Sequence, residues 1–351
     1  MATDRYHRYQ RQMLLPMLGQ AAQQRLAEAR VLLVGCGALG ATIAEQLARA
    51  GVGYLRIADR DIVELSNLQR QVLFDEQHVA QGLPKAIAAA QRLGQINSTI
   101  QIDPRIVDVT PANAEELAGD VNLILDGTDN VSTRYLLNDV AVKLARPWVY
   151  GACVGTEGRV MTVRPGDSPC LRCVFPTPPD GRELPTCDTA GVLGPVAAVV
   201  GALEAVEAIK LLSGNTAAVA PDMLVIDPWH NRFVNIHLQG ARRDDCPTCS
   251  RRRFEFLESR HADTTTRLCG RDAVQVRPDH SGGAGAVDLK RLAERLTAAA
   301  AGHVWLTPYL LRCTLNEGGL TLTTFADGRV IVKGTTDPAR ARAIVARYLG
   351  M

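Results

Sequence analysis

The stretch of this chain that most restricts its fold is residues 30–70. An apolar segment at 31–34 is followed by the glycine-rich loop GCGALG, an alanine-rich segment and a second apolar segment that ends in acid. This order predicts a βαβ unit, in which glycines let a phosphate approach the backbone N–H groups at the start of the helix. A carboxylate at the end of the second strand can accept hydrogen bonds from ribose hydroxyls. The pattern therefore predicts a nucleotide site containing Gly35, Gly37, Ala38, Gly40 and Asp59.

The loop alone does not distinguish ATP from NAD or FAD, so residues outside it decide. Arg70, in the motif SNLQR, and Lys85, in the motif GLPK, add two cations near the expected phosphates. A nicotinamide dehydrogenase needs neither, since its chemistry is hydride transfer, whereas transfer at a phosphate requires fixed positive charge. Ordinary surface charges are the alternative interpretation. Both residues, however, follow the expected carboxyl ends of strands, where open α/β sheets bind ligands, and this favours ATP.

A second acidic motif, DGTDN at 126–130, follows another apolar segment. It is expected at the same edge of the sheet. Asp129 could bind Mg²⁺ through oxygen while substrate phosphates complete the coordination shell. Alternatively, Asp126 or Asp129 caps the helix that begins near Val131.

The nine cysteines fall into distinct groups. Two CxxC pairs, Cys170 with Cys173 and Cys246 with Cys249, have a spacing that lets two thiolates from one turn occupy two corners of a tetrahedron. We expect a structural zinc site, with redox disulfides or unligated thiols as the alternatives. The sequence around Cys36, Cys153 and Cys313 is apolar or strand-like, so these are expected to be buried small side chains. Cys187 differs because it lies in a proline- and glycine-rich segment, 176–195, that predicts a long crossover loop.

Composition favours an intracellular enzyme. The formal charge of +2 gives no electrostatic case for nucleic acid or an anionic membrane. No apolar run reaches membrane length, and residues 1–12 are too polar for a signal peptide. Free CxxC pairs suit a reducing compartment. We therefore expect a cytoplasmic protein with no nucleic-acid or membrane partner.

The expected fold class is α/β: a doubly wound, Rossmann-like, mostly parallel sheet with helices on both faces, followed by a small α+β module. The sequence predicts a first domain at 1–250, a polar linker at 251–266 and a C-terminal module at 267–351. In the module, the element order βαβββα is expected, with a hairpin turn at Gly328 and a last helix that begins at Asp337 and Pro338.

Several motifs together resemble the MoeB/ThiF adenylyltransferases, relatives of ubiquitin-activating enzymes. They are RYxRQ at 8–12, GCGALG, the D-x-D of Asp59 and Asp61, SNLQRQ, GLPKA, DGTDN and the two CxxC pairs, and they span about residues 5–250 in the family's order. The resemblance implies an enzyme that uses ATP to activate the C-terminal Gly-Gly carboxylate of a ubiquitin-like sulfur carrier as an acyl-adenylate, releasing pyrophosphate. That carrier would be MoaD-like in molybdopterin synthesis, ThiS-like in thiamine synthesis, or a related protein.

The resemblance also implies residue roles. Arg70 and Lys85 would contact the phosphates, Asp59 the ribose and Asp129 the Mg²⁺. Arg11 matches an arginine that crosses a dimer interface to the partner's phosphates, which implies a homodimer. Cys187 matches a position that forms a thioester or an acyl-disulfide in some members, with a merely exposed thiol as the alternative. The remaining residues expected around the nucleotide are Asp61, Ser66, Asn67, Gln69 and Asn130.

The chain departs from members that end in a rhodanese domain, because the segment around Cys269 is no rhodanese loop. Sulfur is therefore expected from a separate sulfurtransferase or cysteine desulfurase, and the C-terminal module has no assigned role. Two other classes remain as alternatives. One is a catalytically silent scaffold that binds a ubiquitin-like protein, and the other is an NAD-dependent oxidoreductase.

Overall fold

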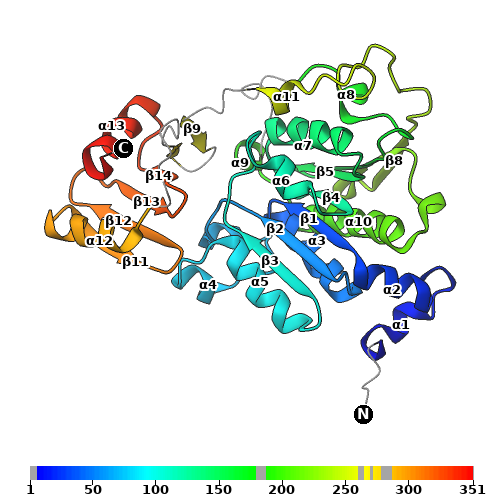
Figure 1. Ribbon diagram of the computed structural model, residues 1–351, viewed down its shortest axis with the longest axis horizontal. Helices are drawn as coiled ribbons and strands as arrows, with labels where there is room; N and C mark the ends of the chain where they lie inside the picture. Colours follow the sequence, from blue (N-terminus) through cyan, green and yellow to red (C-terminus); the bar gives the residue numbers. More distant parts are fainter. Residues whose placement is uncertain (1–5, 179–186, 260–264, 269–271, 278–286, 351) are drawn as a thin grey trace. The chain divides into compact units, whose positions relative to one another are not determined.

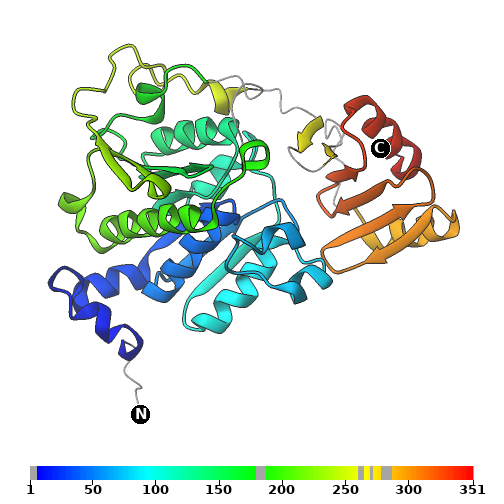
Figure 2. The ribbon, with the colours of Figure 1, turned by 180° about the vertical axis from the view of Figure 1, so that it is seen from behind.

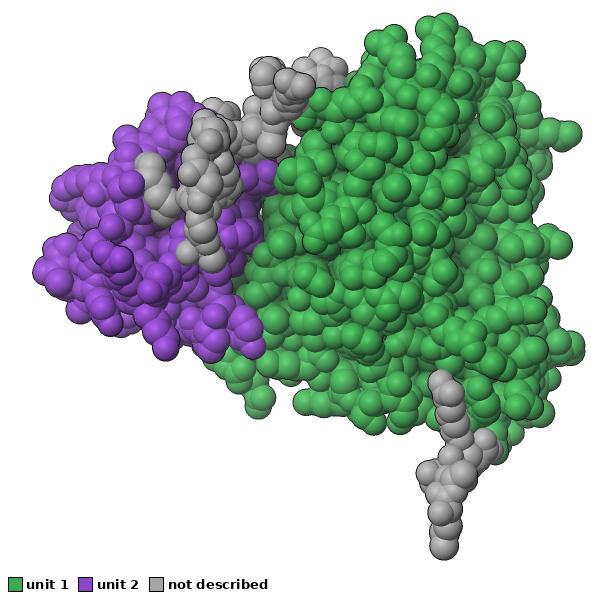
Figure 3. Space-filling view, in the orientation of Figure 1, with its two compact units in different colours: residues 1–259 green, residues 260–351 purple. Residues whose placement is uncertain are grey.

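The structure, a computed structural model, describes residues 6–178, 187–259, 265–268, 272–277 and 287–350. The chain divides into two compact units, Met1–Ser259 and Arg260–Met351, which are coloured separately in Figure 3. No helix within the described residues is both long and apolar enough to cross a membrane.

The first unit is built on an eight-stranded sheet with the order β3-β2-β1-β4-β5-β6-β7-β8 (Figure 1). The strands from β3 to β5 in this order are parallel, and β6, β7 and β8 are added antiparallel. This confirms the expected Rossmann-like sheet. Buried apolar side chains fill β1, β2 and β4, as strands covered on both faces require. The strands are β1 (Arg30–Val34), β2 (Tyr54–Ala58), β3 (Gln101–Arg105), β4 (Leu123–Asp126), β5 (Trp148–Val154), β6 (Glu157–Val163), β7 (Met223–Asp227) and β8 (Arg232–Ile236).

Helices cover both faces of this sheet. Helices α3, α5 and α10 lie on one side of the strands and α6 and α7 on the other (Figures 1 and 2). Helix α10 has Pro195 in its first turn and ends at Gly214 in the left-handed conformation, as its sequence predicts. The helices are α1 (Gln10–Met13), α2 (Gln20–Glu28), α3 (Ala38–Ala50), α4 (Glu76–Ala80), α5 (Lys85–Ile96), α6 (Ala114–Ala118), α7 (Val131–Lys143), α8 (Leu171–Val174), α9 (Cys187–Ala190), α10 (Gly194–Ser213) and α11 (Glu255–Glu258).

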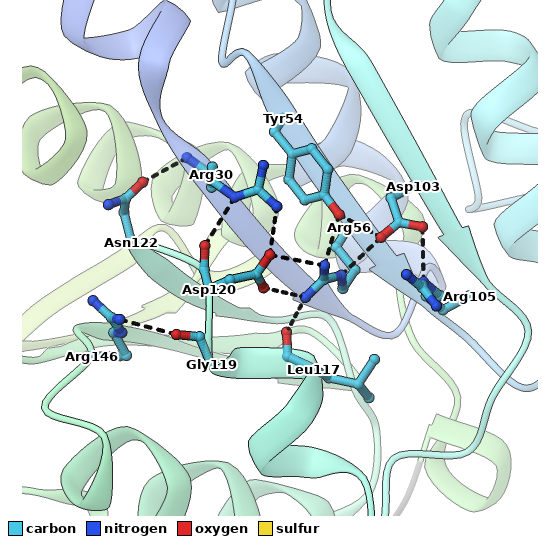
Figure 4. Close-up of polar contacts among 10 residues, drawn as sticks. All are labelled: Arg30, Tyr54, Arg56, Asp103, Arg105, Leu117, Gly119, Asp120, Asn122 and Arg146. Carbon is cyan, nitrogen blue, oxygen red and sulfur yellow. Dashed lines mark hydrogen bonds and ion pairs between the residues drawn. The ribbon is translucent and has the colours of Figure 1, made fainter.

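An ion-pair network joins β1, β2, β3 and the turn that precedes β4 (Figure 4). At its centre the guanidinium of Arg56 contacts Asp103 at 2.9 Å and Asp120 at 2.6 Å, and donates to the Leu117 carbonyl at 2.7 Å. Arg30 also pairs with Asp120, at 2.6 Å. These contacts hold the pKa of Asp120 down at about 2, chiefly through its hydrogen bond to Arg56.

The edge strand β8 is exposed along its whole length. Phe233 is 62% exposed and Val234 is 53% exposed, and the neighbouring Trp229 is 67% exposed. This end of the sheet therefore carries apolar side chains that no described residue covers.

The second unit is a six-stranded antiparallel sheet with the order β11-β12-β13-β14-β10-β9. Helix α12 packs on β11 and β12, and α13 packs on β9, β10 and β14. The hairpin turn at Gly328, with a positive φ of 83°, and the capping of the last helix by Asp337 are confirmed. The elements are β9 (Thr265–Leu268), β10 (Ala273–Val276), α12 (Leu289–Ala298), β11 (Gly302–Leu306), β12 (Leu310–Leu315), β13 (Thr321–Phe325), β14 (Val330–Lys333) and α13 (Pro338–Leu349).

Two details differ from the sequence predictions. The strand expected at 305–314 is a hairpin of β11 and β12, because the Thr307 hydroxyl accepts hydrogen bonds from the N–H groups of Tyr309 and Leu310 and closes a turn. The expected linker at 251–266 is shorter, since the first unit continues to Ser259. Phe254 and Leu257 are buried in its core, so this segment is packed despite its many charges. A further strand, β9, pairs with β10 and was not expected, so the expected order βαβββα becomes ββαββββα.

Candidate nucleotide site and cysteine cluster

The glycine-rich loop packs backbone to backbone against the loop after β4. Gly35 has a φ of +83°, and a Cβ there would lie 2.7 Å from the carbonyl oxygen of Gly127. A Cβ on Gly127 would lie 2.2 Å from the Gly35 oxygen, and one on Gly40 only 2.0 Å from it. Side chains are therefore excluded where the two loops meet. Helix α3 starts at Ala38 with Gly37 as an N-cap that offers no side-chain hydrogen bond, which leaves its first N–H groups available to an anion.

Asp59 ties the glycine-rich loop to the end of β2. One carboxylate oxygen accepts from the Cys36 N–H at 2.6 Å, and the other accepts from the Asp61 N–H at 2.7 Å. Burial raises the pKa of Asp59, against the opposing attraction of the Lys85 ammonium. Burial likewise raises the pKa of the Cys36 thiol, which keeps it neutral. A carboxylate offers about four lone-pair directions, so these two bonds leave Asp59 able to accept from ribose hydroxyls.

Lys85 begins α5 beside the same strand end. Its side chain is buried, and its ammonium lies 3.2 Å from the Asp61 carboxylate. The backbone N–H of Lys85 also donates to the Asp61 carbonyl at 2.8 Å. The two predicted residues are thus brought together, and Asp61 holds Lys85 at the carboxyl end of β2.

The SNLQRQ segment forms a short turn in which one of the predicted nucleotide residues is buried and others are exposed. Asn67 is buried and accepts from the Glu64 N–H at 3.1 Å, so its amide shapes the turn. Ser66 and Gln69 are exposed, and the Ser66 carbonyl accepts from Arg70 Nη1 at 3.0 Å. A Cβ on Gly194, at the start of α10, would lie 3.4 Å from the Arg70 Cβ. Arg70 therefore lies between this turn and the first residue of α10.

Gln71 is a candidate site residue that the sequence analysis did not single out, although it stands inside the motif SNLQRQ. It is buried, and a Cβ on Gly37 would lie 3.8 Å from its Nε2. Its Oε1 is buried with no hydrogen-bond partner among the described residues. A buried acceptor without a donor is costly. The position of Gln71 beside the glycine-rich loop therefore fits a ligand that would supply the donor.

The DGTDN loop is organised by Asp126 and Arg134, another residue that the sequence did not single out. Asp126 accepts from the N–H and hydroxyl of Thr128 at 2.9 and 2.7 Å, and Arg134 Nε lies 3.4 Å from its other oxygen. Arg134 Nη2 also donates to the Thr128 carbonyl at 2.7 Å. The alternative that Asp126 or Asp129 caps α7 is wrong. Asn130 is the cap, and its side chain accepts from the Thr133 N–H at 3.0 Å, which leaves Asp129 exposed at the rim.

Glu204 of α10 is a buried acid close to this loop. It is 0% exposed, and neither carboxyl oxygen has a hydrogen-bond partner among the described residues. A Cβ on Gly151 would lie 1.8 Å from its Oε1, so the carboxyl group rests on the backbone of β5. Burial raises the pKa of Glu204 well above the usual range, and the nearby Asp126 raises it further. The protonated form is therefore favoured.

The four cysteines of the CxxC pairs converge. Their sulfur atoms all lie within 4.8 Å of one another. The Sγ separations are 3.9 Å for Cys170 and Cys173, 3.6 Å for Cys170 and Cys246, and 3.4 Å for Cys173 and Cys249. Tetrahedral zinc with Zn–S bonds near 2.3 Å requires separations of about 3.8 Å. The cluster therefore fits a zinc ion with no open coordination position, which is a structural site.

Helix α7 anchors both arms of this cluster. Asp139 accepts from the Thr248 hydroxyl and from the Phe256 N–H, each at 2.9 Å, and Asn138 accepts from the Leu171 N–H at 2.8 Å. Burial raises the pKa of Asp139 to about 6. The helix that begins at the DGTDN loop thus also carries the side chains that hold the cysteine loops.

Three other predicted residues stand apart from the nucleotide site or outside the described side chains. Arg11 is exposed, on a segment bonded to the C-terminal end of α3, the end opposite the glycine-rich loop. Cys187 begins α9, which contacts β5, and its side chain lies outside the described residues. Cys269 is likewise outside them. The expectation that Cys36, Cys153 and Cys313 are buried is confirmed.

The fold and this edge of the sheet define a nucleotide-binding α/β protein of the doubly wound class. Comparison with protein families goes further. A model of the ThiF family matches residues 9–248, more than half of the chain, and the chain belongs to that family.

Individual relatives agree with the family. The chain is 41% identical over 343 residues to "Sulfur carrier protein ThiS adenylyltransferase" of Bacillus subtilis (strain 168), covering 98% of this chain and 99% of that protein. It is 41% identical over 246 residues to "Adenylyltransferase and sulfurtransferase MOCS3" of Danio rerio, but spans only 53% of that relative's length. Among solved structures, E. coli MccB with ATP shares the fold, with a TM-score of 0.61 and 22% identity over 69% of this chain and 74% of that one.

Proposed function

We propose that this protein is an adenylyltransferase that activates the C-terminal carboxylate of a ThiS-like, ubiquitin-like sulfur carrier with ATP. The observation that carries the proposal is the meeting of the glycine-rich loop, Asp59, Lys85 and the DGTDN loop at the carboxyl ends of β1, β2 and β4. The full-length likeness to a ThiS adenylyltransferase favours thiamine over molybdopterin synthesis, because the MOCS3 relative matches only 70% of this chain.

The chemistry needs positioning and charge more than a general base. A C-terminal carboxylate is ionised near neutral pH, and it can attack the α-phosphate of ATP directly, with pyrophosphate as the leaving group. The carrier becomes an acyl-adenylate that a later sulfur donor can use. Lys85 and Arg70 would neutralise the charge that develops on the phosphates. Buried Lys85, held by Asp61, is suited to this role because it needs little reorganisation.

The remaining nucleotide contacts would come from residues at the same edge of the sheet, the carboxyl ends of β1, β2 and β4. Asp59 would accept from the ribose, and the Gln71 Oε1 would accept from a donor group of the bound ligand, since phosphate oxygens only accept. Asp129 is the exposed carboxylate that would hold Mg²⁺. The ion would supply positive charge to the phosphate oxygens. Arg134 fixes the Thr128 carbonyl directly before Asp129 and so orients this loop.

Arg11 would act across a homodimer. The segment that carries it is bonded to the Ala50 carbonyl, at the far end of α3 from the glycine-rich loop. Thirteen residues of helix separate these ends by about 20 Å, more than an arginine side chain can span. If Arg11 contacts phosphates, they belong to a second subunit. Exposed Leu14, Leu15 and Met17 beside it give that subunit an apolar surface to cover.

The later sulfur chemistry involves other proteins. We infer a separate sulfurtransferase or cysteine desulfurase as the donor. Cys187, at the start of α9 next to β5, would either receive the acyl group or remain a bystander thiol. Sulfur transfer that survives Cys187→Ser would exclude the covalent role. None of the described cysteines is in a disulfide, and cysteines of this kind are typical of the reducing cytoplasm.

ATP–pyrophosphate exchange with purified protein tests the proposal. ThiS-like and MoaD-like carriers are offered separately, each with an intact or a truncated Gly-Gly tail. We expect exchange with the intact ThiS-like carrier alone, its loss with Lys85→Ala, and its persistence with Lys143→Ala, a control on the exposed side of α7. Exchange with the MoaD-like carrier alone would move the protein to molybdopterin synthesis. No exchange with either carrier, despite bound ATP, would favour the silent scaffold.

A further inference from the structure

The N-terminal motif RYQRQ is bonded to the C-terminal ends of two helices. The guanidinium of Arg8 donates to the Ile96 carbonyl at 2.6 Å, at the end of α5. The Tyr9 hydroxyl accepts from Asn97 Nδ2 at 2.8 Å, and Asn97 Nδ2 also donates to the Ala48 carbonyl of α3. The last carbonyls of a helix have no partner within the helix. The side chains of Arg8 and Asn97 therefore donate hydrogen bonds to carbonyl groups near the C-terminal ends of α5 and α3.

Gln12 and Gln23 complete this arrangement. Gln12 Nε2 donates to Gln23 Oε1 at 2.7 Å and to the Ala50 carbonyl at 3.1 Å, while Gln23 Nε2 donates to the same carbonyl at 2.9 Å. Gln23 and Asn97 are both 0% exposed. The ring of Tyr9 lies on Gly51, where a Cβ would be 2.5 Å from the ring. These buried polar groups leave the segment little freedom to shift.

Arg11 itself takes no part in this network and is exposed. It lies on α1, which has only four residues and follows a three-residue 3₁₀ helix, His7–Tyr9. Helices this short are not stable alone. The position of the Arg11 backbone is therefore set by its neighbours Tyr9 and Gln12.

The same two helices carry the nucleotide site at their other ends. Helix α3 begins at the glycine-rich loop, and α5 begins with Lys85. We propose that Tyr9, Gln12, Gln23 and Asn97 form a polar brace that positions Arg11 for the phosphates of a partner subunit. This inference rests on the proposed function, because it requires Arg11 to act across a dimer. The four residues are positioning residues that act through Arg11.

Gln12→Met tests the brace, because methionine has a similar length but cannot make the two hydrogen bonds. Gln10→Met is the matched control, since Gln10 is an exposed neighbour in the same motif. In ATP–pyrophosphate exchange with the ThiS-like carrier, we expect turnover of Gln12→Met to fall by about ten-fold or more. A loss of this size is expected when a group that contacts the substrate is misplaced. The ATP concentration for half-maximal binding should change much less than turnover, because the subunit's own loop and Lys85 are intact. Gln10→Met should behave as the wild type.

Mixed dimers then show in which subunit Gln12 acts. Lys85→Ala inactivates its own site but still presents a braced Arg11. A mixture of Gln12→Met with Lys85→Ala should therefore regain activity in the Gln12→Met site, as should a mixture of Arg11→Ala with Lys85→Ala. Before the mixing experiment, Gln12→Met and Arg11→Ala are each shown to unfold at the same temperature as the wild type. Tyr9→Phe, which keeps the ring and removes the bond to Asn97, is the second variant should Gln12→Met fold poorly.

The outcomes separate two failures. Wild-type turnover in both Gln12→Met and Tyr9→Phe would overturn the brace. The brace would also be overturned if Lys85→Ala subunits rescued Arg11→Ala but did not rescue Gln12→Met. Failure to rescue Arg11→Ala would instead overturn the cross-subunit role of Arg11, and the brace with it. Pyrophosphate exchange by the wild type would still stand as support for adenylation.

Discussion

At the scale of single residues, the sequence identified groups whose chemistry is tied to a motif and missed those whose chemistry comes from burial. Lys85 and Asp59 stand at the ends of recognisable segments, and both lie at the expected edge. Glu204 stands in an alanine- and valine-rich helix, where a glutamate predicts a solvent-facing position. It is instead wholly buried, because the side of α10 that carries it faces β5. Nothing local in the sequence distinguishes these cases.

We predict that Glu204→Gln stabilises the protein at alkaline pH and leaves it nearly unchanged in mild acid. The pKa of Glu204 is raised in the folded state, so above the ordinary glutamate pKa the folded state holds a proton that the unfolded state has released. Stability contributed by this group is then lost as pH rises toward the folded pKa. Glutamine cannot ionise and avoids the loss. Thermal unfolding at pH 5 and pH 8 measures this, with a rise of a few degrees expected at pH 8 alone.

An equal shift at both pH values would mean that unfolding does not change the protonation of Glu204, and would contradict a raised pKa in the folded state. Glu157→Gln on β6 is a suitable control, since the Glu157 side chain is exposed whereas that of Glu204 is buried. Its midpoint should follow the wild type at both pH values.

At the scale of elements, α7 links two features that the sequence placed separately. Its first turn is capped by Asn130 of the DGTDN loop, and its middle holds the cysteine loops through Asn138 and Asp139. The spacing of the cysteines predicted that the four thiols would meet. It could not predict where, because the meeting point depends on how β7, β8 and the following loop return to α7.

We predict one zinc ion per chain and a loss of stability in the first unit when it is removed. Cys246→Ala should lower the metal content measured by mass spectrometry and lower the unfolding temperature. Cys153→Ala, which removes a buried thiol outside the cluster, should keep the zinc and cause a smaller shift. A zinc-free wild-type protein with unchanged stability would show that the cluster holds together as thiols.

At the scale of the whole molecule, the first unit's sheet has a nucleotide site and an ion-pair network at different places along its strands. The carboxyl ends of β1, β2 and β4 meet at the nucleotide site, whereas the Arg56 network joins the strands elsewhere (Figure 4). The parallel order could be predicted from the βαβ pattern. The network could not, since Arg56, Asp103 and Asp120 are far apart in the chain and become neighbours only when the chain folds. The second unit was predicted as a class but not in full, because its β11–β12 turn depends on one hydroxyl.

We predict that Arg56→Met costs about 3 kcal/mol of stability at neutral pH, as expected when one partner of a largely buried ion pair is removed. Arg105→Met is the matched control: it removes an exposed arginine from the same Asp103 and should cost about 1 kcal/mol or less. The contribution of Asp120 is present above its unfolded pKa and lost as pH falls through about 2. Urea unfolding measures the loss, and ATP binding should be unaffected. Equal effects of the two substitutions would contradict a special role for burial.

The uncovered strand β8 has a practical consequence for anyone who concentrates this protein. An exposed strand at the edge of a sheet presents unpaired N–H and carbonyl groups, and Phe233 and Val234 add apolar surface to it. Two molecules that meet along this edge can continue each other's sheet. Self-association through β8 would therefore compete with the homodimer proposed for catalysis, and an oligomer seen at high concentration need not be the one that brings Arg11 to a neighbouring site.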